Sequence, residues 1–434
     1  MLNMNTKINF VSAEEAVKVI KSGDHVHLNA IGNAPQVLIK ALCERGRNGE
    51  LKDVHIHHFH TEGEAPYSAP EFEGIFQHDA FFVGANTRKN VQTGYADYIP
   101  VFLGEAARLY RDGYLKCNVA MIQVCPPDEN GIVSLGTSVD ACLAAMEVAD
   151  YVIAVVNKNV PRAYGDAMFH MSRINIFVED NTPLIEKFYE EPTETDLAIG
   201  RHCAELIEDG ACLQMGIGSL PNATLACLGN HKDLGIHTEM IADGGLKLVE
   251  KGVITGANKV LDKGKIVSTF LLGSNKVYNF VNNNPQVLMQ DVAYTNDPFI
   301  IAQQPKMTAI NSAIEIDLTG QVCADSIGTK QFLEKAMLNK EIVLGDKISS
   351  VSFNVSSIED ISPVSFYVDM EYQTLSPLAV VGLRPNNTME YLNPRNIYFG
   401  QFMVDELIER WEHIYRQPYM GDRRYKLMLL MPER

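Results

Sequence analysis

The segment 216–221, GIGSLP, is a candidate binding turn, and Glu239 is a candidate nucleophile about one helix and one strand further along the chain. Glycines let the backbone turn sharply and approach a ligand closely, and Pro221 suits the first turn of a following helix. Backbone N–H groups at such a turn can donate to an anion or to a developing oxyanion. A carboxylate that faces preorganised N–H donors has the equipment for covalent acyl transfer. The candidate donors are Gly216, Ile217, Gly218, Ser219 and Leu220.

Each of these features also has an ordinary structural interpretation. A GxG turn by itself is a common way to join a strand to a helix, and a lone carboxylate often faces solvent at a strand end. The pattern GxGxxP differs from the dinucleotide pattern GxGxxG, and no acidic residue stands where a ribose would need it. His237 would share a strand face with Glu239, so it either tunes that carboxylate or packs beside it.

The segment HIHHFH, at positions 55–60, raises the question of a metal site. Its four histidines are His55, His57, His58 and His60. Side chains alternate between the two faces of a strand, so at most two of the four converge locally. Neither a cysteine partner nor an HExxH pattern accompanies them. We therefore predict partly exposed strand histidines and no metal ligands.

The elements that must position these residues form a faint internal repeat. Segment 13–42 has the pattern of helix, glycine, strand, turn and helix, and segment 196–228 repeats that order. Glycine and proline have the same spacing in the two turns, which contain Pro35 and Pro221. VAMIQV and YVIAVV, on either side of a helical stretch near 138–148, are typical of parallel strands buried on both faces. We expect an α/β fold of two tandem related open α/β domains with mainly parallel sheets.

The boundary between these domains is expected in the polar segment 190–196, EEPTETD. It separates an N-terminal domain of residues 1–190 from a C-terminal domain of residues 197–434, which carries Glu239. Thr195 or Asp196 is the expected cap of a helix that begins at Leu197.

The composition indicates an ordinary soluble globular protein with ample cores. Of its 434 residues 46% are hydrophobic and 21% are charged, and the formal net charge is -17. This charge argues against nucleic acid or an anionic membrane as the main partner. The eight cysteines are scattered without a CxxC pair, and neither a signal peptide nor a membrane-spanning apolar run is visible. We expect free thiols and a cytoplasmic protein.

The segments around the turn and Glu239 resemble a known family. GIGSLPNA and LGIHTEMIADG are similar to core motifs of the acetyl-CoA hydrolase/transferase family, and most closely to its 4-hydroxybutyrate and butyryl CoA-transferases. Further similar segments follow in family order at 81–105, 125–141, 160–174 and 308–330. The resemblance therefore covers roughly the first three quarters of the chain.

The resemblance implies a CoA-transferase of the two-domain CoA-transferase fold, with a covalent enzyme intermediate. Glu239 would attack an acyl-CoA thioester, and the released CoA would form a glutamyl-CoA thioester on the enzyme. Residues 216–220 would form a CoA-side loop that donates N–H groups to the thioester oxygen. The implied partners are acetyl-CoA and a short-chain carboxylic acid, 4-hydroxybutyrate or butyrate. CoA esters would be substrates, with no permanently bound cofactor and no metal, and the implied assembly is a homodimer or a higher homo-oligomer.

The resemblance stops near Lys330. Family members carry a second glycine-rich motif of the type GxGGQ soon after this point, whereas residues 331–434 contain no glycine pair. Two explanations stay open: this part has diverged, or it comes from a shifted reading frame. A frameshifted tail should lose periodic apolar patterning, yet segment 402–415 is passably amphipathic.

Three functions are consistent with the sequence. The leading one is a CoA-transferase, the second is an acyl-CoA hydrolase in which water resolves the glutamyl thioester, and the third is a non-catalytic acyl-CoA-binding homologue. The unusual C-terminal part keeps the third interpretation open. Added acetate separates them, because it accelerates turnover only in a transferase.

Overall fold

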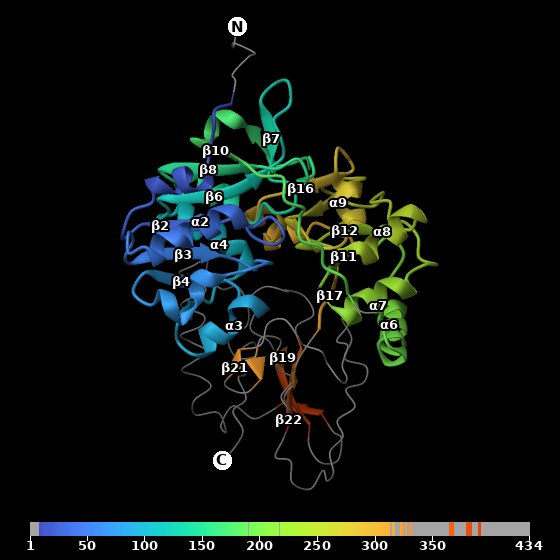
Figure 1. Cartoon of the computed structure of the whole chain (residues 1–434). Helices are drawn as coiled ribbons and strands as arrows, with labels where there is room; N and C mark the ends of the chain where they lie inside the picture. Colours follow the sequence, from blue (N-terminus) through green and yellow to red (C-terminus); the bar gives the residue numbers. More distant parts are fainter. Residues whose placement is uncertain are drawn as a thin grey trace. The chain divides into compact units, whose positions relative to one another are not determined.

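The first of two large β-sheets is built from the N-terminal half of the chain (Figure 1). The computed structural model describes residues 8–312 except Glu190 and Ile217, and after Ser312 it describes only short strands. From edge to edge the strands of this sheet are β1 (Phe10–Val11), β10 (Ile176–Glu179), β8 (Tyr151–Val156), β6 (Val119–Val124), β2 (His25–Leu28), β3 (Val54–His58), β4 (Phe76–Ala80) and β5 (Ala96–Tyr98).

The second sheet follows in the sequence and contains the strands next to the candidate site. From edge to edge its strands are β16 (Val287–Met289), β14 (Ile266–Ser268), β12 (Gly235–His237), β11 (Cys212–Met215) and β17 (Thr308–Ile310). Every neighbouring pair in both sheets is parallel. The prediction of an α/β fold with mainly parallel sheets is confirmed.

The helices lie between these strands in the sequence. They are α1 (Ala13–Ala16), α2 (Gln36–Arg47), α3 (Ala85–Gln92), α4 (Leu103–Arg111), α5 (Cys142–Val148), α6 (Glu194–Leu206), α7 (Ser219–Cys227), α8 (Asp243–Glu250), α9 (Asn275–Val281), α10 (Val292–Thr295) and α11 (Pro298–Ile301), with 3-10 turns η1 (Val17–Val19), η2 (Pro66–Ser68), η3 (Pro70–Phe72) and η4 (Met171–Arg173). Small pairs join β7 (Ile132–Ser134) to β9 (Met168–His170) and β13 (Met240–Ile241) to β15 (Phe270–Leu271). The later strands are β18 (Glu315–Ile316), β19 (Val322–Cys323), β20 (Ser326–Ile327), β21 (Lys330–Gln331), β22 (Val364–Val368), β23 (Ala379–Leu383) and β24 (Met389–Tyr391).

The central strands β6 and β8 carry the apolar runs identified in the sequence. Every residue of β6 is buried, and only Tyr151 of β8 is exposed, as expected for parallel strands covered on both faces. The helix between them begins at Cys142, later than the predicted start near Ser138. Ser138 instead pairs with Phe270 as an isolated bridge, and Asp140 has a φ of 33°, which lies outside the helical region.

The internal repeat extends from the sequence to the strand order. The order β6-β2-β3-β4-β5 in the first sheet matches the order β17-β11-β12-β14-β16 in the second. In both, a helical segment, a strand, a turn and a second helix precede the next parallel strand. Strands β8, β10 and β1 extend only the first sheet. The two halves are thus built on one topology, and the turn before α7 corresponds to the turn before α2.

The start of α6 corrects one detail of the predicted domain boundary. Thr193 is the N-cap, and the helix begins at Glu194 rather than at Leu197. The Thr193 hydroxyl accepts from the N–H of Asp196, whose carboxylate accepts from the N–H of Thr193. This reciprocal capping box fixes the helix start one turn earlier than predicted.

Both sheets belong to one compact unit, Met1–Ser312 with Asp325–Val343, and a second unit consists of Ala313–Ala324 and Leu344–Arg434. The division into residues 1–190 and 197–434 stays a prediction. Seven cysteines within the described part of the chain are free thiols, and all except Cys227 are buried. Among the described helices none has the length and apolar character needed to cross a membrane.

Candidate active site

Glu239 lies just beyond the carboxyl end of β12, and its backbone is firmly held. Its carbonyl oxygen accepts hydrogen bonds from the hydroxyl of Ser268 at 2.8 Å, from the N–H of Thr269 at 3.1 Å and from the N–H of Phe270 at 3.0 Å. All three donors follow or end β14, the neighbouring parallel strand. With the backbone fixed, only the side-chain torsions of Glu239 remain to direct its carboxylate.

Thr238 connects Glu239 with the glycine turn. The N–H of Met215 donates to the Thr238 hydroxyl at 2.9 Å, and that hydroxyl lies 3.2 Å from the carbonyl oxygen of Met215. Met215 directly precedes Gly216, and Thr238 directly precedes Glu239. Since β11 and β12 are parallel neighbours, the turn and the glutamate emerge at the same edge of the sheet, where open α/β sheets bind ligands.

The carboxylate of Glu239 has one side-chain partner among the described residues. The amide of Asn296, at the end of α10, donates to Oε1 of Glu239. Burial raises the pKa of Glu239, and the hydrogen bond from Asn296 opposes that rise. A carboxylate of raised basicity is a stronger nucleophile once it is ionised.

His237, two residues before Glu239, contacts Thr295, the residue before Asn296. Its Nε2 lies 2.8 Å from the carbonyl oxygen of Thr295, and because a carbonyl only accepts, Nε2 carries the proton. Burial lowers the pKa of His237, so the ring is neutral at pH 7. His237 and Glu239 therefore bind the consecutive residues Thr295 and Asn296. The interpretation of His237 as a packing residue is favoured, with the added role of placing Asn296.

Gly104, in α4 of the first half, packs closely against Asn296. A Cβ at Gly104 would lie 2.9 Å from the carbonyl oxygen of Asn296 and 3.0 Å from its Cβ. Such distances are shorter than carbon side chains tolerate, so only glycine permits this approach. The position of the Glu239 partner thus depends on a residue of the other half.

The two glycines of the turn have different surroundings. The N–H of Gly216 donates to the carbonyl oxygen of Ile310 in β17 at 2.7 Å, and a Cβ there would meet the same oxygen at 2.7 Å. Gly218 has a φ of 124°, which favours glycine, yet a Cβ there would meet nothing within 4 Å. Gly216 is therefore required by the packing of β17, and its N–H donates to Ile310, while its role in a ligand-binding turn stays a prediction.

The remaining predicted donors lie at the start of α7. Gly218 is its N-cap, and Ser219 and Leu220 are its first two residues, whose N–H groups have no acceptor within the helix. Pro221 lies in the first turn, as predicted. Ile217 lies outside the described residues. The start of α7 thus offers N–H donors beside open space, at the sheet edge from which Glu239 emerges.

A second glutamate follows the equivalent strand of the first half. The triplet His60-Thr61-Glu62 lies beyond β3, which ends at His58, and the same triplet His237-Thr238-Glu239 begins at the last residue of the equivalent strand β12. Glu62 lies 2.8 Å from Nε2 of His60 and 3.2 Å from Nζ of Lys187. Burial raises the pKa of Glu62, but these two contacts outweigh it and the net shift is downward. The repeated HTE in the sequence is the signal that identifies this residue.

The predicted histidine segment divides between the two sheet faces. His58 lies 2.7 Å from the hydroxyl of Tyr67, while His55 and His57 share the opposite face. As expected, no more than two histidines of this segment share the face of His55, but His57 and His58 are buried rather than partly exposed, because helices and neighbouring strands cover the parallel sheet. His25 of β2 joins them, which the segment alone does not reveal.

Comparison with known proteins gives consistent results along most of the chain. The family models for the acetyl-CoA hydrolase/transferase N-terminal and C-terminal domains match residues 5–186 and 273–334. The 4-hydroxybutyrate coenzyme A transferase of Clostridium kluyveri is 45% identical over 75% of this chain and 75% of its own length. The succinyl-CoA:acetate/propanoyl-CoA:succinate CoA transferase of Fasciola hepatica is 46% identical over 73% of this chain and 66% of its own length.

Solved structures agree with these relatives. RipA from Yersinia pestis has a TM-score of 0.68 and 34% identity, covering 72% of this chain and 75% of that chain. A 4-hydroxybutyrate CoA-transferase from Porphyromonas gingivalis has a TM-score of 0.64 and 35% identity, covering 72% of this chain and 75% of that chain. The second family match ends at residue 334, close to Lys330, where the resemblance was expected to stop.

Proposed function

This chain belongs to the acetyl-CoA hydrolase/transferase family, and on that basis we propose that it is a CoA-transferase which uses Glu239 as its nucleophile. Its proposed substrates are acetyl-CoA and a short-chain carboxylic acid, with 4-hydroxybutyrate or butyrate as the first acids to test. The observation that carries the proposal is the Glu239 carboxylate, which has a fixed backbone and a raised pKa at the sheet edge beside the start of α7.

The proposed reaction proceeds through two covalent enzyme species. The ionised Glu239 attacks the thioester carbonyl of the acyl-CoA, and the bond to sulfur breaks to leave a mixed anhydride and CoA thiolate. The thiolate then attacks the glutamyl carbonyl, which releases the acyl group as a free carboxylate and leaves a glutamyl-CoA thioester. An incoming carboxylate reverses these steps and leaves as the new acyl-CoA. Because one thioester replaces another, the exchange needs neither ATP nor a metal ion.

The surrounding residues supply position and charge stabilisation. Each addition step places negative charge on a carbonyl oxygen, and the N–H groups of Ser219 and Leu220 are the proposed donors to that oxygen. Asn296 holds one carboxylate oxygen and thereby turns the other toward the substrate. His237 donates to the carbonyl oxygen of Thr295 and thereby helps to hold the next residue, Asn296, in place.

The choice of acids to test follows from the names of several relatives rather than from the geometry of the site. The relatives are named for 4-hydroxybutyrate, butyrate, succinate and propanoate. One added hydroxyl in an apolar pocket gives at most roughly a hundredfold discrimination, so these acids are close competitors. We also propose that the protein is cytoplasmic and forms a homo-oligomer. Light scattering of the purified protein would test the oligomeric state.

The decisive experiment is to trap the covalent species. The protein is incubated with acetyl-CoA alone, treated with borohydride and digested, so that a thioester at Glu239 is reduced to an alcohol that shifts the mass of its peptide. Glu239→Gln is the matched control and should give no shift. A wild-type protein that binds CoA esters without this shift would contradict the proposal and favour a non-catalytic binding protein.

A second measurement separates transfer from hydrolysis. Acetate is added to butyryl-CoA and the protein, and both free CoA and acetyl-CoA are followed. A transferase forms acetyl-CoA in proportion to the butyryl-CoA that is lost. Release of free CoA at a rate that acetate does not change would identify a hydrolase instead.

A further inference from the structure

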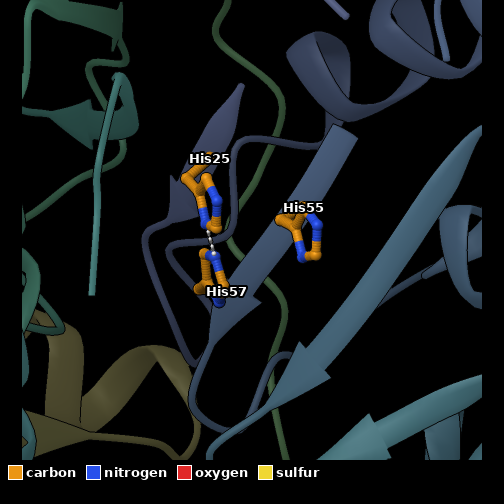
Figure 2. A group of neighbouring side chains, drawn as sticks. All are labelled: His25, His55 and His57. Carbon is orange, nitrogen blue, oxygen red and sulfur yellow. Dashed lines mark hydrogen bonds between the residues drawn. The ribbon is translucent and has the colours of Figure 1, made fainter. Parts of the chain in front are cut away.

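Three histidines gather on the neighbouring strands β2 and β3, outside the proposed active site (Figure 2). In the parallel register, His25 lies opposite His55, and His27 lies opposite His57. Since alternate residues share a face, the side chains of His25, His55 and His57 project from one face of the sheet. One ring nitrogen of each lies within 4.8 Å of the others.

Two of these histidines, His25 and His57, already bring a ring nitrogen each to one point. Nδ1 of His25 lies 2.9 Å from Nε2 of His57, and their ring planes differ by only 5°. At this distance one nitrogen carries a proton and the other presents its lone pair. Figure 2 shows the two nitrogens pointing at one another, with His55 beside them on β3. A metal ion would replace that proton and use both lone pairs.

Asp79 of β4 lies behind two of these rings. Its Oδ2 is 2.8 Å from Nδ1 of His55 and 3.6 Å from Nδ1 of His57. Nδ1 of His57 is buried and has no hydrogen-bond partner among the described residues. A carboxylate behind the ring orients a histidine and strengthens it as a metal ligand. The Nε2 atoms of both rings are then left for an ion.

We propose that His25, His55 and His57 form a site for a divalent transition-metal ion such as Zn²⁺, with Asp79 as the carboxylate behind His55 and His57. Zinc–nitrogen distances of about 2.0–2.1 Å place tetrahedral ligand nitrogens about 3.3 Å apart. Ring rotations that move the nitrogens by about 1 Å would therefore bring them to coordination distance. His55 is 30% exposed and His57 only 1%, which gives the ion a way in and water the fourth position.

The proposed ion would act on the fold rather than on the reaction. The histidines lie on β2 and β3 of the first sheet, whereas Glu239 and the glycine turn follow β12 and β11 of the second. Coordination would join β2 to β3, the strand that precedes Glu62. The expected readouts are therefore metal affinity and thermal stability.

The test uses full-length protein that has been stripped with a chelator and freed of any affinity tag. Isothermal titration with Zn²⁺ should give one site per chain, and Co²⁺ should give the intense visible absorption of tetrahedral cobalt. His25→Ala should weaken Zn²⁺ binding at least about a hundredfold, and Asp79→Asn about 10–100-fold. Zn²⁺ should also raise the Tm of the wild-type protein but not that of His25→Ala.

His202→Ala is the matched control, because this histidine is 78% exposed on α6. It should bind Zn²⁺ as the wild type does. His25 is partly exposed, so its replacement is expected to leave the fold intact, which circular dichroism checks. Equal Zn²⁺ affinity in the His25→Ala and His202→Ala variants, or no binding by the wild type, would overturn the proposal.

Discussion

The two halves of the chain each place a glutamate after the equivalent strands β3 and β12, yet the two carboxylates differ in chemistry. Glu62 faces His60 and Lys187, and its pKa is lowered overall. Among the described residues, the side-chain partner of Glu239 is the neutral amide of Asn296, and the pKa of Glu239 is raised by burial. The neighbours of each carboxylate thus determine whether it is a fixed anion or a candidate nucleophile.

The backbones at the two glutamates differ as well. The carbonyl oxygen of Glu239 has three donors from the neighbouring segment, while that of Glu62 accepts from the side chain of Gln36 at 3.2 Å. Covalent chemistry tolerates little displacement of the attacking atom. The carbonyl oxygen with more hydrogen bonds belongs to the glutamate with the raised pKa, which suits the proposed reaction.

The largest expected effect distinguishes these two glutamates. Glu239→Gln and Glu239→Asp should each lower transfer by about a thousandfold or more, because an amide is a poor nucleophile and aspartate draws the carboxylate back. Both variants should still bind CoA esters. Glu62→Gln should keep the covalent adduct in the borohydride assay. An adduct in Glu239→Gln, with deamidation excluded, would remove the difference between the two positions.

The second effect concerns the turn, which is glycine-dense only in the second half. Gly218→Val should lower kcat roughly 100–1000-fold with a smaller change in binding, because its side chain would enter the open space beside the proposed oxyanion donors. Gly113→Val is the control for backbone strain, since Gly113 also has a positive φ and open surroundings. Equal losses of kcat and binding in Gly218→Val would indicate a purely structural turn.

The third effect tests the Asn296 hydrogen bond through pH. Glu239 must be ionised to attack, and the hydrogen bond stabilises the ionised form, so Asn296→Ala should raise the pKa further. Activity would then be lost at a higher pH as the solution is acidified. A bond of this kind, at about 1.5–3 kcal/mol, corresponds to a shift of about one to two units in the acid limb of kcat/KM. The exposed Asn279→Ala should leave that limb unchanged.

The smallest effect concerns Glu62 and the stability of the first half. Because its folded pKa is lowered, Glu62 stabilises the protein above its unfolded pKa, and this contribution is lost as pH falls through the folded pKa. Its partner Lys187 is 35% exposed, so solvent screening limits the loss in Glu62→Gln to about 1 kcal/mol at pH 7. Denaturant unfolding at pH 7 and pH 3 measures this, and a difference that persists at pH 3 would contradict the assignment.

The sequence identifies those parts of the site that lie in one continuous segment. The GxG turn, Pro221 and Glu239 carry local signals, and the apolar runs predict parallel strands. Asn296 carries no such signal, because it reaches Glu239 across 57 residues and only the fold brings them together. The same holds for His25, which joins His55 and His57 through strand pairing.

Two local details depend on hydrogen bonds that the residue types alone do not reveal. The start of α6 was placed too late, since Thr193 and Asp196 form a capping box that competes with a start at Leu197. The N–H of Gly216, a predicted ligand donor, donates in this structure to β17, which pairs with β11 from far along the chain. In both cases a specific hydrogen bond decided between two conformations that the residue types allow.

The close approach of Gly104 to Asn296 has a consequence for recombination between relatives. A chimera that exchanges only residues 1–190 would bring a foreign α4 against the Asn296 that holds Glu239. If the incoming sequence has any side chain at position 104, Asn296 must shift, and the foreign half would impair the position of the Glu239 partner. The absence of a Cβ at position 104 therefore limits which halves can be combined. Exchange of whole halves should succeed only between parents that share this glycine.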